Sequence, residues 1–446
     1  MIMSGRTFRR VIFAAVLLCV SAVCANAQTY GSYAPYSIFG VGDLSSSGTA
    51  YNKSMGGVGI AGRTNRFINV LNPASITERD SLSFMADFSL AGDNKIFTQG
   101  DMKSVSNTFN VLDCAMSFPI YKSLSAMFGV SPYSSTGYNY SFDYDDPAII
   151  GNAGNISYAA SGKGALYQTY GALGVTLFDR LSLGAEAIFY FGSNEKTYYG
   201  LFSNSSYNGV KNGQNIQLNA FSGKFGLQYE QPLGTKDKLI LGATYTMPAN
   251  LRGYIEDYSY SSGAAAVDTL YHRVDTLVHN PGKLRLAGEV GVGICYTHAD
   301  KFMIEMDYTR SDWTGCGFDN TPGFRGNTSR SATTSVFTAT TTQAFRLGFE
   351  IVPNRSDIRY YFKKVAYRGG AYYKDEYYLL DGHKINSMGI TLGATFPVFK
   401  WYNGITVAVD LGQRGTISDN LIRERYVNFS VGMNIFDIWF HKQRYD

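Results

Sequence analysis

The segments that link the predicted β-strands of this chain are alternately short and long, from about residue 82 to the C-terminus. Short links are predicted at residues 118–123, 178–181, 231–238, 297–301, 352–364 and 398–404, the fifth being the longest of them. Long links are predicted at about residues 92–108, 139–163, 193–217, 249–282, 311–340, 375–384 and 413–424. Fourteen antiparallel strands with short turns at one end and long loops at the other are typical of a barrel that crosses an outer membrane.

The predicted strands have one apolar and one polar face, because successive side chains of a strand point to opposite sides. In residues 302–308 the even-numbered side chains are apolar, whereas two of the three odd-numbered ones are acidic. Residues 405–412 repeat the pattern, with odd-numbered aliphatic side chains opposite small or polar ones. A soluble barrel would bury its apolar side chains inside, so the apolar face is predicted to contact lipid and the polar face a hydrated or plugged lumen. The predicted lumenal charges are Asp87, Asp113, Glu186, Lys224, Arg285, Glu289, Glu305, Asp307, Arg346, Glu350, Arg368 and Asp410.

Unpaired charges in a narrow lumen would be costly. We therefore expect Glu305 and Asp307 to lie within reach of a basic side chain from a neighbouring strand or from the segment that fills the lumen.

The N-terminal residues have the composition of a secretory signal peptide. An apolar run at residues 11–23 lies between three arginines and an Ala-Asn-Ala sequence that ends at Ala27, where cleavage is predicted. Cys24 fits a lipoprotein signal less well, because the bulky Val23 precedes it. Three cysteines remain after cleavage, and an odd number provides no disulfide framework.

Residues 28–80 are organised differently, with many Gly, Ser and Asn residues and little sustained alternation. Such backbone is tolerated at membrane depth only where protein encloses it, since lipid cannot satisfy its N–H and C=O groups. We therefore predict a signal peptide at residues 1–27, an N-terminal hatch at residues 28–80 that plugs the lumen, an all-β transmembrane β-barrel at residues 81–440 and a periplasmic C-terminal tail at residues 441–446. Both termini of the mature chain are then periplasmic.

Several motifs resemble those of the FadL family of outer-membrane long-chain fatty-acid transporters. The first are SMGGVGIA at residues 54–61 and NPAS at residues 72–75. Others are GKG at residues 162–164, LSLG at 181–184, YRGGAYY at 367–373, GITLG at 389–393 and YVNFSVG at 426–432. The resemblance extends over nearly the whole mature chain and is strongest to a branch described as outer-membrane transport-like proteins. It implies a 14-stranded barrel with an N-terminal hatch, and the link lengths predict the same number of strands.

The resemblance leaves two functions of different classes open, because this fold permits both. One is transport of a hydrophobic or amphipathic, long-chain fatty-acid-like molecule that leaves sideways through the barrel wall. The other is a non-transporting scaffold or partner subunit of a secretion or assembly complex. The expected partners are a hydrophobic ligand or lipid, the outer membrane and a protein that the sequence does not identify. A net charge of +4 and a pI near 8.5 give no basic patch that would favour nucleic acid.

The predicted third strand contains two residues that are unusual in a closed barrel. In FadL-type transporters a kink in this strand makes the lateral opening. Here Gly129 and Pro132 lie in residues 124–138, and proline lacks the N–H that a complete ladder requires. A bulge or gap is one interpretation, and the other is that Pro132 lies above the lipid band where the strand ends.

In FadL-type transporters, movement of the hatch would open the barrel wall. The resemblance therefore makes the hatch motifs candidate gating residues. The simpler interpretation is that the Asn-Pro-Ala sequence is a rigid turn that packs the plug, and that the glycines form tight turns. The glycines also fit the dinucleotide pattern GxGxxG, but without the strand–turn–helix context that gives this pattern meaning. The candidates are Gly56, Gly57, Gly59, Asn72, Pro73 and Ala74.

We expect no catalytic activity, cofactor or metal ion. The five histidines are scattered and accompany neither a G-x-S-x-G elbow nor metal-ligand spacing. His272 and His279 fall in one predicted loop together with Asp268 and Asp275, but solvated loop histidines explain them more simply.

Overall fold

The computed structural model describes residues 32–46, 48–80, 82–144, 151, 154–204, 206–262, 267–276, 284–299, 301–321, 323–324, 337–398 and 403–438. The predicted signal peptide and the predicted C-terminal tail lie outside these residues. No helix in the described part of the chain is long and apolar enough to cross a membrane.

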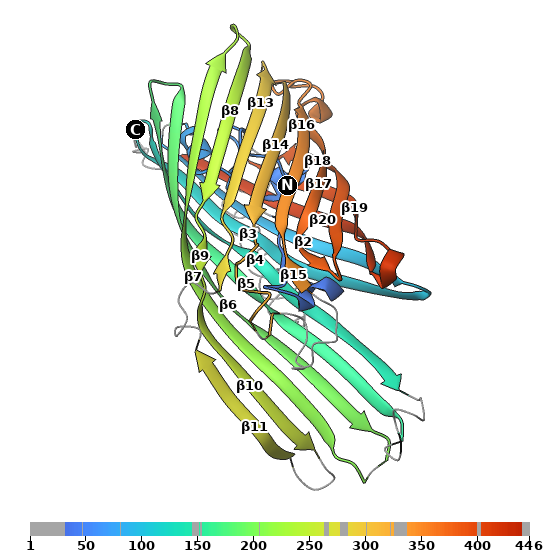
Figure 1. Cartoon of the computed structure of the whole chain (residues 1–446). Coiled ribbons are helices and arrows are strands. Elements are labelled where there is room, and N and C mark those ends of the chain that lie inside the picture. Colours follow the sequence, from blue (N-terminus) through green and yellow to red (C-terminus); the bar gives the residue numbers. More distant parts are fainter. Residues whose placement is uncertain are drawn as a thin grey trace, which may run out of the picture.

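Fourteen antiparallel strands form a closed barrel (Figure 1). Each pairs with the next, and the last pairs with the first, which closes the wall. The prediction of an all-β, 14-stranded barrel is therefore confirmed. The wall strands are β2 (Ser83–Gln99), β3 (Met102–Tyr121), β4 (Leu124–Tyr144), β5 (Ile156–Leu177), β6 (Leu181–Phe202), β7 (Gly209–Pro232), β8 (Asp237–Thr246), β13 (Glu289–His298), β14 (Phe302–Asp312), β16 (Thr341–Ile351), β17 (Ala366–Leu380), β18 (His383–Pro397), β19 (Gly404–Arg414) and β20 (Arg423–Ile438).

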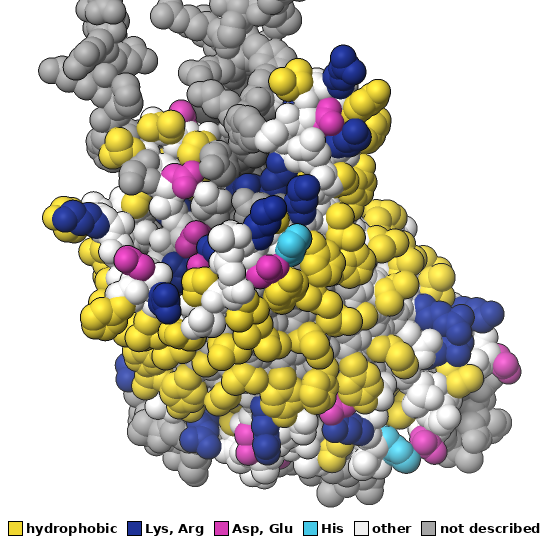
Figure 2. All heavy atoms as spheres, turned by 90° about the horizontal axis from the view of Figure 1, so that it is seen from above, with side chains coloured by type: hydrophobic (Ala, Val, Ile, Leu, Met, Phe, Trp, Pro, Cys, Tyr) yellow, Lys and Arg dark blue, Asp and Glu magenta, His cyan; other side chains and the backbone are white. Residues whose placement is uncertain are grey.

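The strands turn their apolar side chains outward and their polar ones inward. In β19, Val407 and Leu411 are exposed while Thr406 is buried, and in β14 Met306 is exposed while Glu305 is buried. Figure 2 shows the resulting broad hydrophobic area, with charged side chains gathered toward its margins. This arrangement suits a wall that faces lipid and encloses a polar interior.

Several predicted long loops are continuous strands instead. The predicted loop at residues 92–108 belongs to β2 and β3, which are joined by a tight turn at residues 100–101. The predicted loops at residues 139–163 and 193–217 largely continue β4 to β7, so irregular loops were the wrong prediction there. Polar strands with water on both faces need no hydrophobic alternation, because pairing with their neighbours satisfies the backbone.

The wall strands β4 to β7 project beyond the rest of the barrel at the elaborated end (Figure 1). The hairpin of β10 (Arg252–Ser262) and β11 (Val267–Thr276) extends this sheet from the edge of β7. At the same end β15 (Phe337–Ala339) pairs with β17, and η5 (Ser418–Asn420) connects β19 to β20. At the opposite end the links are short except for residues 352–365, which contain η4 (Tyr361–Lys363).

Residues 32–80 precede the wall and pack against its inner side. They contain η1 (Pro35–Ile38), β1 (Asp43–Leu44), α2 (Ala50–Lys53) and η2 (Pro73–Thr77). Thr49 and Asn52 form a capping box that begins α2, which contacts β19 and β20. On the other side of the barrel η2 contacts β4 to β7, and η1 contacts β4. The N-terminal segment thus crosses the lumen, as a hatch does.

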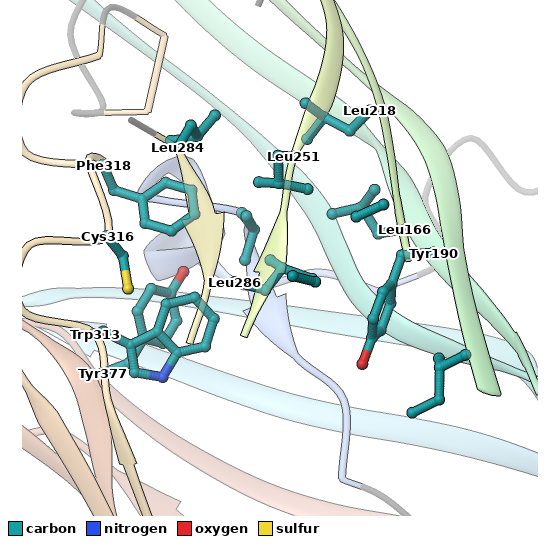
Figure 3. Packing of buried hydrophobic residues seen from close by; sticks show 14 of the residues in the cluster. Leu166, Tyr190, Leu218, Leu251, Leu284, Leu286, Trp313, Cys316, Phe318 and Tyr377 are labelled. Carbon is teal, nitrogen blue, oxygen red and sulfur yellow. The ribbon is translucent and has the colours of Figure 1, made fainter. Parts of the chain in front are cut away.

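The largest hydrophobic cluster includes residues of the hatch and of the segments that follow β8 and β14. Trp313, Phe318 and Tyr377 pack there with Leu284 and with the short pair β9 (Ala249–Asn250) and β12 (Arg285–Leu286) (Figure 3). Arg285, predicted to be a lumenal charge on a wall strand, lies on β12 and is exposed instead. Leu166, Tyr190 and Leu218 of the wall belong to the same cluster, so the apolar interior joins the hatch, the inner side of β5 to β7 and the long-link segments.

Candidate functional site

Wall glycines form a seat for the second half of the hatch. Gly174, Gly184 and Gly226 are register partners across β5, β6 and β7, and η2 lies directly on them. A Cβ built on Gly184 would come within 2.3 Å of the carbonyl carbon of Pro73, and one built on Gly226 within 2.0 Å of Asn72 Oδ1. Only glycine leaves room for so close an approach of the hatch to the wall.

The first half of the hatch has a similar seat on the opposite wall. Gly348 and Gly370 are register partners on β16 and β17, and both face the backbone around Met55. A Cβ on Gly370 would lie 2.4 Å from the backbone nitrogen of Gly56, which also donates a hydrogen bond to Thr391 Oγ1 at 2.7 Å. We call these two sets of wall glycines the glycine belt.

The predicted gating motif is a buried turn within this seat. Asn72 is fully buried, and its Nδ2 donates to the carbonyl oxygen of Ile60 at 2.7 Å. Its Oδ1 accepts from the N–H of Ala74 at 2.9 Å, which caps η2, with Pro73 at the first helical position. Every polar atom of the Asn72 side chain is therefore used in holding the hatch together.

The glycine-rich motif of the hatch binds two wall carboxylates through its backbone. The N–H groups of Gly59 and Ile60 donate to Oδ2 of Asp307 at 2.8 and 3.0 Å. The N–H groups of Ala61 and Gly62 donate to Oε1 of Glu305 at 2.8 and 2.6 Å. Asp307 has a basic neighbour of the kind predicted, since Arg346 is its register partner on β16, but Arg346 donates to Thr309 and neither carboxylate forms an ion pair with a described residue. Backbone amides bind both carboxylates instead. The sequence concealed this because an amide donor leaves no side-chain signature.

Gly56 and Gly57 prepare this geometry. Both have positive φ angles, +71° and +79°, in the left-handed region that favours glycine. They turn the chain after α2 so that the following amides point at β14.

Two arginines attach the hatch more widely. The guanidinium group of Arg368 lies 4.7 Å from the ring centroid of Tyr51 and 4.6 Å from that of Phe67, and its Nε donates to Glu350 at 2.8 Å. Arg368 is 3% exposed, so this cation–π contact is desolvated.

Arg414 forms the second attachment, between β19 and β1. It binds Asp43 through two nitrogen atoms and Glu424 at 2.6 Å, while Lys95 Nζ lies 3.7 Å from Asp43. Burial alone would raise the pKa of Asp43, but the positive charges of Arg414 and Lys95 outweigh it and lower the pKa from 3.8 to about 2. Asp43 therefore carries its charge at any ordinary pH. Neither Asp43 nor Arg414 was predicted, since residues 371 positions apart show no shared pattern.

The remaining predicted charges lie on the inner side of the wall. Ser89 Oγ donates to Asp87 at 2.8 Å, and Tyr372 donates to Asp410 at 3.0 Å. Glu186 and Lys224 are register partners on β6 and β7. Arg346 donates to Thr309, while Asp113 and Glu289 line the internal cavity.

The wall parts between the outer halves of β3 and β4. Their pairing runs from Tyr121 and Leu124 to Cys114 and Val130 and ends there. On the far side of each strand, β2 and β5 continue to pair to the strand tips. We call this parting the wall split.

The predicted interruption residues lie at the base of the split. Gly129 belongs to the second-last pair of β3 and β4, and Pro132 follows the last one. The register of β4 against β5 shifts between Pro132 and Ser134, a bulge of the kind that proline favours. Beyond it β1 pairs with β4 at Ser134 and Ser135. The structure does not bring the Asn-Pro-Ala turn to this place, because η2 lies at the level of Gly174, which pairs with Ser125 of β4, and the split begins beyond Gly129.

A cavity of about 1550 Å³ lies between the hatch and the wall and reaches the split. Val111 and Leu112 of β3 and Pro132 and Tyr133 of β4 line its edge there. Its lining combines apolar and aromatic side chains with many charged ones, and the charged groups favour water and polar ligands. The charged residues of the lining are Asp43, Lys53, Asp93, Lys95, Asp113, Lys163, Glu186, Glu195, Lys224, Glu289, Arg346, Lys374, Glu376, Asp410, Arg414 and Glu424.

The histidine pair considered from the sequence is not brought together in the described structure. Nε2 of His272 lies 2.7 Å from Glu256 Oε1, and His279 lies outside the described residues. Among the described residues no group of three or more His, Cys, Asp or Glu side chains is placed to hold a metal ion.

The closed 14-stranded wall and its inner hatch define the class of protein: an outer-membrane β-barrel with the fold of FadL-type proteins. The toluene transporter TodX of Pseudomonas putida is similar with a TM-score of 0.57 at 14% identity, over 90% of this chain and 100% of that one. The toluene transporter TbuX of Ralstonia pickettii gives 0.56 at 14% identity, over 87% and 98%. A FadL homologue of Pseudomonas aeruginosa gives 0.52 at 12% identity, over 88% and 98%. At these identities the likeness establishes the fold alone.

The family model described as BamG matches residues 8–446, and the chain belongs to the BamG family. No curated protein matches its sequence.

Proposed function

We propose that this protein is a non-transporting barrel subunit of an outer-membrane assembly complex, and that its hatch is a permanent plug. Membership of the BamG family supports a role in such a complex. The structural observation that carries the proposal is the binding of the hatch to the glycine belt and to the carboxylates of β14.

A hatch seated in this way resists movement. Displacing it would leave the carboxylates of Glu305 and Asp307 buried without their four amide donors. Hydrogen bonds to charged groups contribute about 1.5–3 kcal/mol each, so their combined loss would be prohibitive. It would also open voids over the belt, where glycines provide no side chain to fill them.

The internal cavity supports the same conclusion. Sites for hydrophobic ligands are lined mainly by apolar and aromatic side chains with few polar groups. This cavity has apolar and aromatic side chains, but it also carries acidic and basic ones from several wall strands and from the hatch, such as Asp113, Lys224 and Lys53. A fatty-acid chain would have to desolvate these groups without compensating them.

Isolation of the complex tests the proposal. The full-length protein carries an affinity tag in the link between β19 and β20, near residue 419. After brief cross-linking, it is extracted from native outer membranes in mild detergent. We expect it to co-isolate in fixed stoichiometry with other envelope proteins, and its depletion to lower the amounts of unrelated outer-membrane barrels. Isolation of the protein alone, with unchanged levels of other barrels on depletion, would contradict the assembly role.

Lateral transport remains the second candidate, and the wall split is the observation that favours it. Leu44 of β1 and Ser134 of β4 are register partners at the split, so a Leu44→Cys/Ser134→Cys pair has the spacing that a disulfide requires. For a transporter, oxidation should block uptake of a labelled fatty acid and reduction should restore it, whereas the Leu44→Cys single variant should not respond. A scaffold shows no uptake in either state.

A further inference from the structure

The link between β16 and β17 forms an ordered projection at the short-link end of the barrel. We call residues 354–364 the knob. The N–H of Asn354 donates to the carbonyl oxygen of Lys363 at 2.8 Å, which closes the loop. Asp357 Oδ1 accepts from the N–H groups of Arg359 and Tyr360 at 2.9 and 2.7 Å. These hydrogen bonds hold the knob in a single conformation.

This ordered loop exposes large apolar side chains. Ile358 is 95% exposed, Phe362 70% and Tyr360 59%. A rigid loop gains nothing in folding from such residues, because their burial free energy is not realised. Exposed apolar groups held on an ordered loop mark a surface that binds another molecule.

The knob faces the mouth of the barrel. Ile358 and Tyr361 line a pocket of about 390 Å³, together with Val398 of the neighbouring link and with Arg66 and Phe67 of the hatch. Tyr361 also donates to the carbonyl oxygen of Pro397 at 2.9 Å, which fixes the pocket wall. Because hatch residues form its opposite side, the pocket lies at the mouth of the lumen and not on the lipid-facing wall.

The knob carries an excess of positive charge. Its acidic residue, Asp357, is 3.4 Å from Lys363, and Arg355 binds Glu350 of the wall at 3.2 Å. Arg359 and Lys364 form no ion pair with a described residue. Lys364 lines the pocket, so free positive charge stands beside the exposed Ile358. The complementary surface is acidic, with an apolar side chain to enter the pocket.

We propose that the knob and its pocket bind an acidic segment of a periplasmic partner protein, whose apolar side chain fills the space between Ile358 and the hatch. This inference rests on the proposed function, since a subunit of an assembly complex requires a surface for its partners, and it places that surface at the periplasmic mouth. A partner bound here contacts wall and hatch together.

A second short link offers a matched control. Phe178, between β5 and β6, is 90% exposed and lies at the same end of the barrel. Its link is only residues 178–180, and Phe178 lines neither the internal cavity nor the pocket beside the knob. If exposed aromatic residues at this end only contact the lipid headgroup region, Phe178 and Phe362 should behave alike.

Photo-cross-linking in intact cells distinguishes the two cases. p-Benzoylphenylalanine replaces Phe362 in one strain and Phe178 in another, and the cross-linked peptides are mapped by mass spectrometry. We expect position 362 to yield one protein adduct whose mapped peptide is rich in Asp and Glu, and position 178 to yield lipid adducts alone. Added substitutions Ile358→Glu or Lys364→Glu should lower the adduct at position 362 by about tenfold, as loss of a hot-spot contact does. Changing an acidic residue of the mapped peptide to Lys should restore cross-linking to the Lys364→Glu variant.

Lipid adducts at both positions would overturn the proposal, and so would a protein adduct that neither Ile358→Glu nor Lys364→Glu weakens. Isolation of the complex separates this inference from the proposed function. A complex that stays whole in the Ile358→Glu/Lys364→Glu variant refutes docking at the knob and leaves the assembly role standing. A wild-type protein that isolates alone refutes the assembly role itself. Heat-modifiable mobility on gels shows that each variant still forms its barrel.

Discussion

Gly184 of β6 lies so close to Pro73 of the hatch that a Cβ on Gly184 would come within 2.3 Å of the carbonyl carbon of Pro73. The two residues are 111 positions apart, and their contact replaces side-chain packing with contact between backbones. The hatch is therefore fitted to the wall at the level of the main chain, where even a methyl group would displace it.

The first prediction concerns this seat. Gly184→Val should destabilise the protein by about 1–3 kcal/mol, since overpacking forces the hatch away from the wall. Gly171→Val on β5 is the control, because Gly171 has no atom within 4 Å of its Cβ position. Urea-induced unfolding in detergent, followed by tryptophan fluorescence, measures both variants. Equal losses of stability would show that the hatch does not rest on Gly184.

The second prediction concerns the carboxylates of β14. Asp307→Ala leaves the N–H groups of Gly59 and Ile60 without their acceptor, at a cost of about 1–3 kcal/mol or more. Glu289→Ala on the adjacent strand β13 removes an exposed carboxylate that accepts no hydrogen bond from a described residue, and should be nearly neutral. Hydrogen exchange at the amides of Gly59 and Ile60 should accelerate in the first variant and remain unchanged in the second. Protection of these amides in Asp307→Ala would contradict the assignment.

The third prediction is a dependence on pH. The pKa of Asp43 is lowered from 3.8 to about 2 in the folded protein, so the stability that its charge contributes is complete above pH 3.8 and is lost as the pH falls through 2. A spin label at Ser46→Cys should remain immobile down to about pH 4 and become mobile toward pH 2. Asp43→Asn should give a more mobile label already near neutral pH, with a smaller further change on acidification. A label that is released above pH 4 in the wild type would show that another group controls the attachment.

The fourth prediction tests the two faces of the wall. Ile390 is 54% exposed on the lipid side, and Ile390→Arg should cost about 2–4 kcal/mol. From the sequence, Thr391→Arg on the lumenal face would be expected to cost much less. The structure reverses that expectation, because Thr391 is buried and accepts a hydrogen bond from Gly56 of the hatch. The lumenal control is instead Asn110→Arg, at a half-buried position that lines the cavity. The free energy of folding into lipid vesicles is measured for Ile390→Arg, Thr391→Arg and Asn110→Arg.

The sequence was sufficient for the strand count and for the direction of the side chains in the regular part of the wall, although it misplaced Arg285. Lipid outside and polar groups inside impose a period of two on each wall strand, and that period is visible in residues 302–308 and 405–412. It was insufficient at the elaborated end, where residues 92–108 form strands. There both faces meet water, so no alternation marks the strand.

The candidate site was predictable only in part. Asn72 and Pro73 were candidates because their motif resembles the hatch of FadL-type proteins, and a residue followed by proline is a local turn signal that does not depend on the rest of the fold. The pairing of Asp43 with Arg414 gave no such signal, and neither did the amide donors of residues 59–62. Both depend on which residues face each other across the lumen.

The sequence by itself determined that this chain forms a 14-stranded barrel with a segment left over to fill it, because strand periodicity and link length are local properties. Only the tertiary structure decided how that segment is held, where the wall parts and which glycines matter. Gly184 and Gly171 are the same residue type one strand apart, and only closure of the barrel places Pro73 against the first and leaves the second clear.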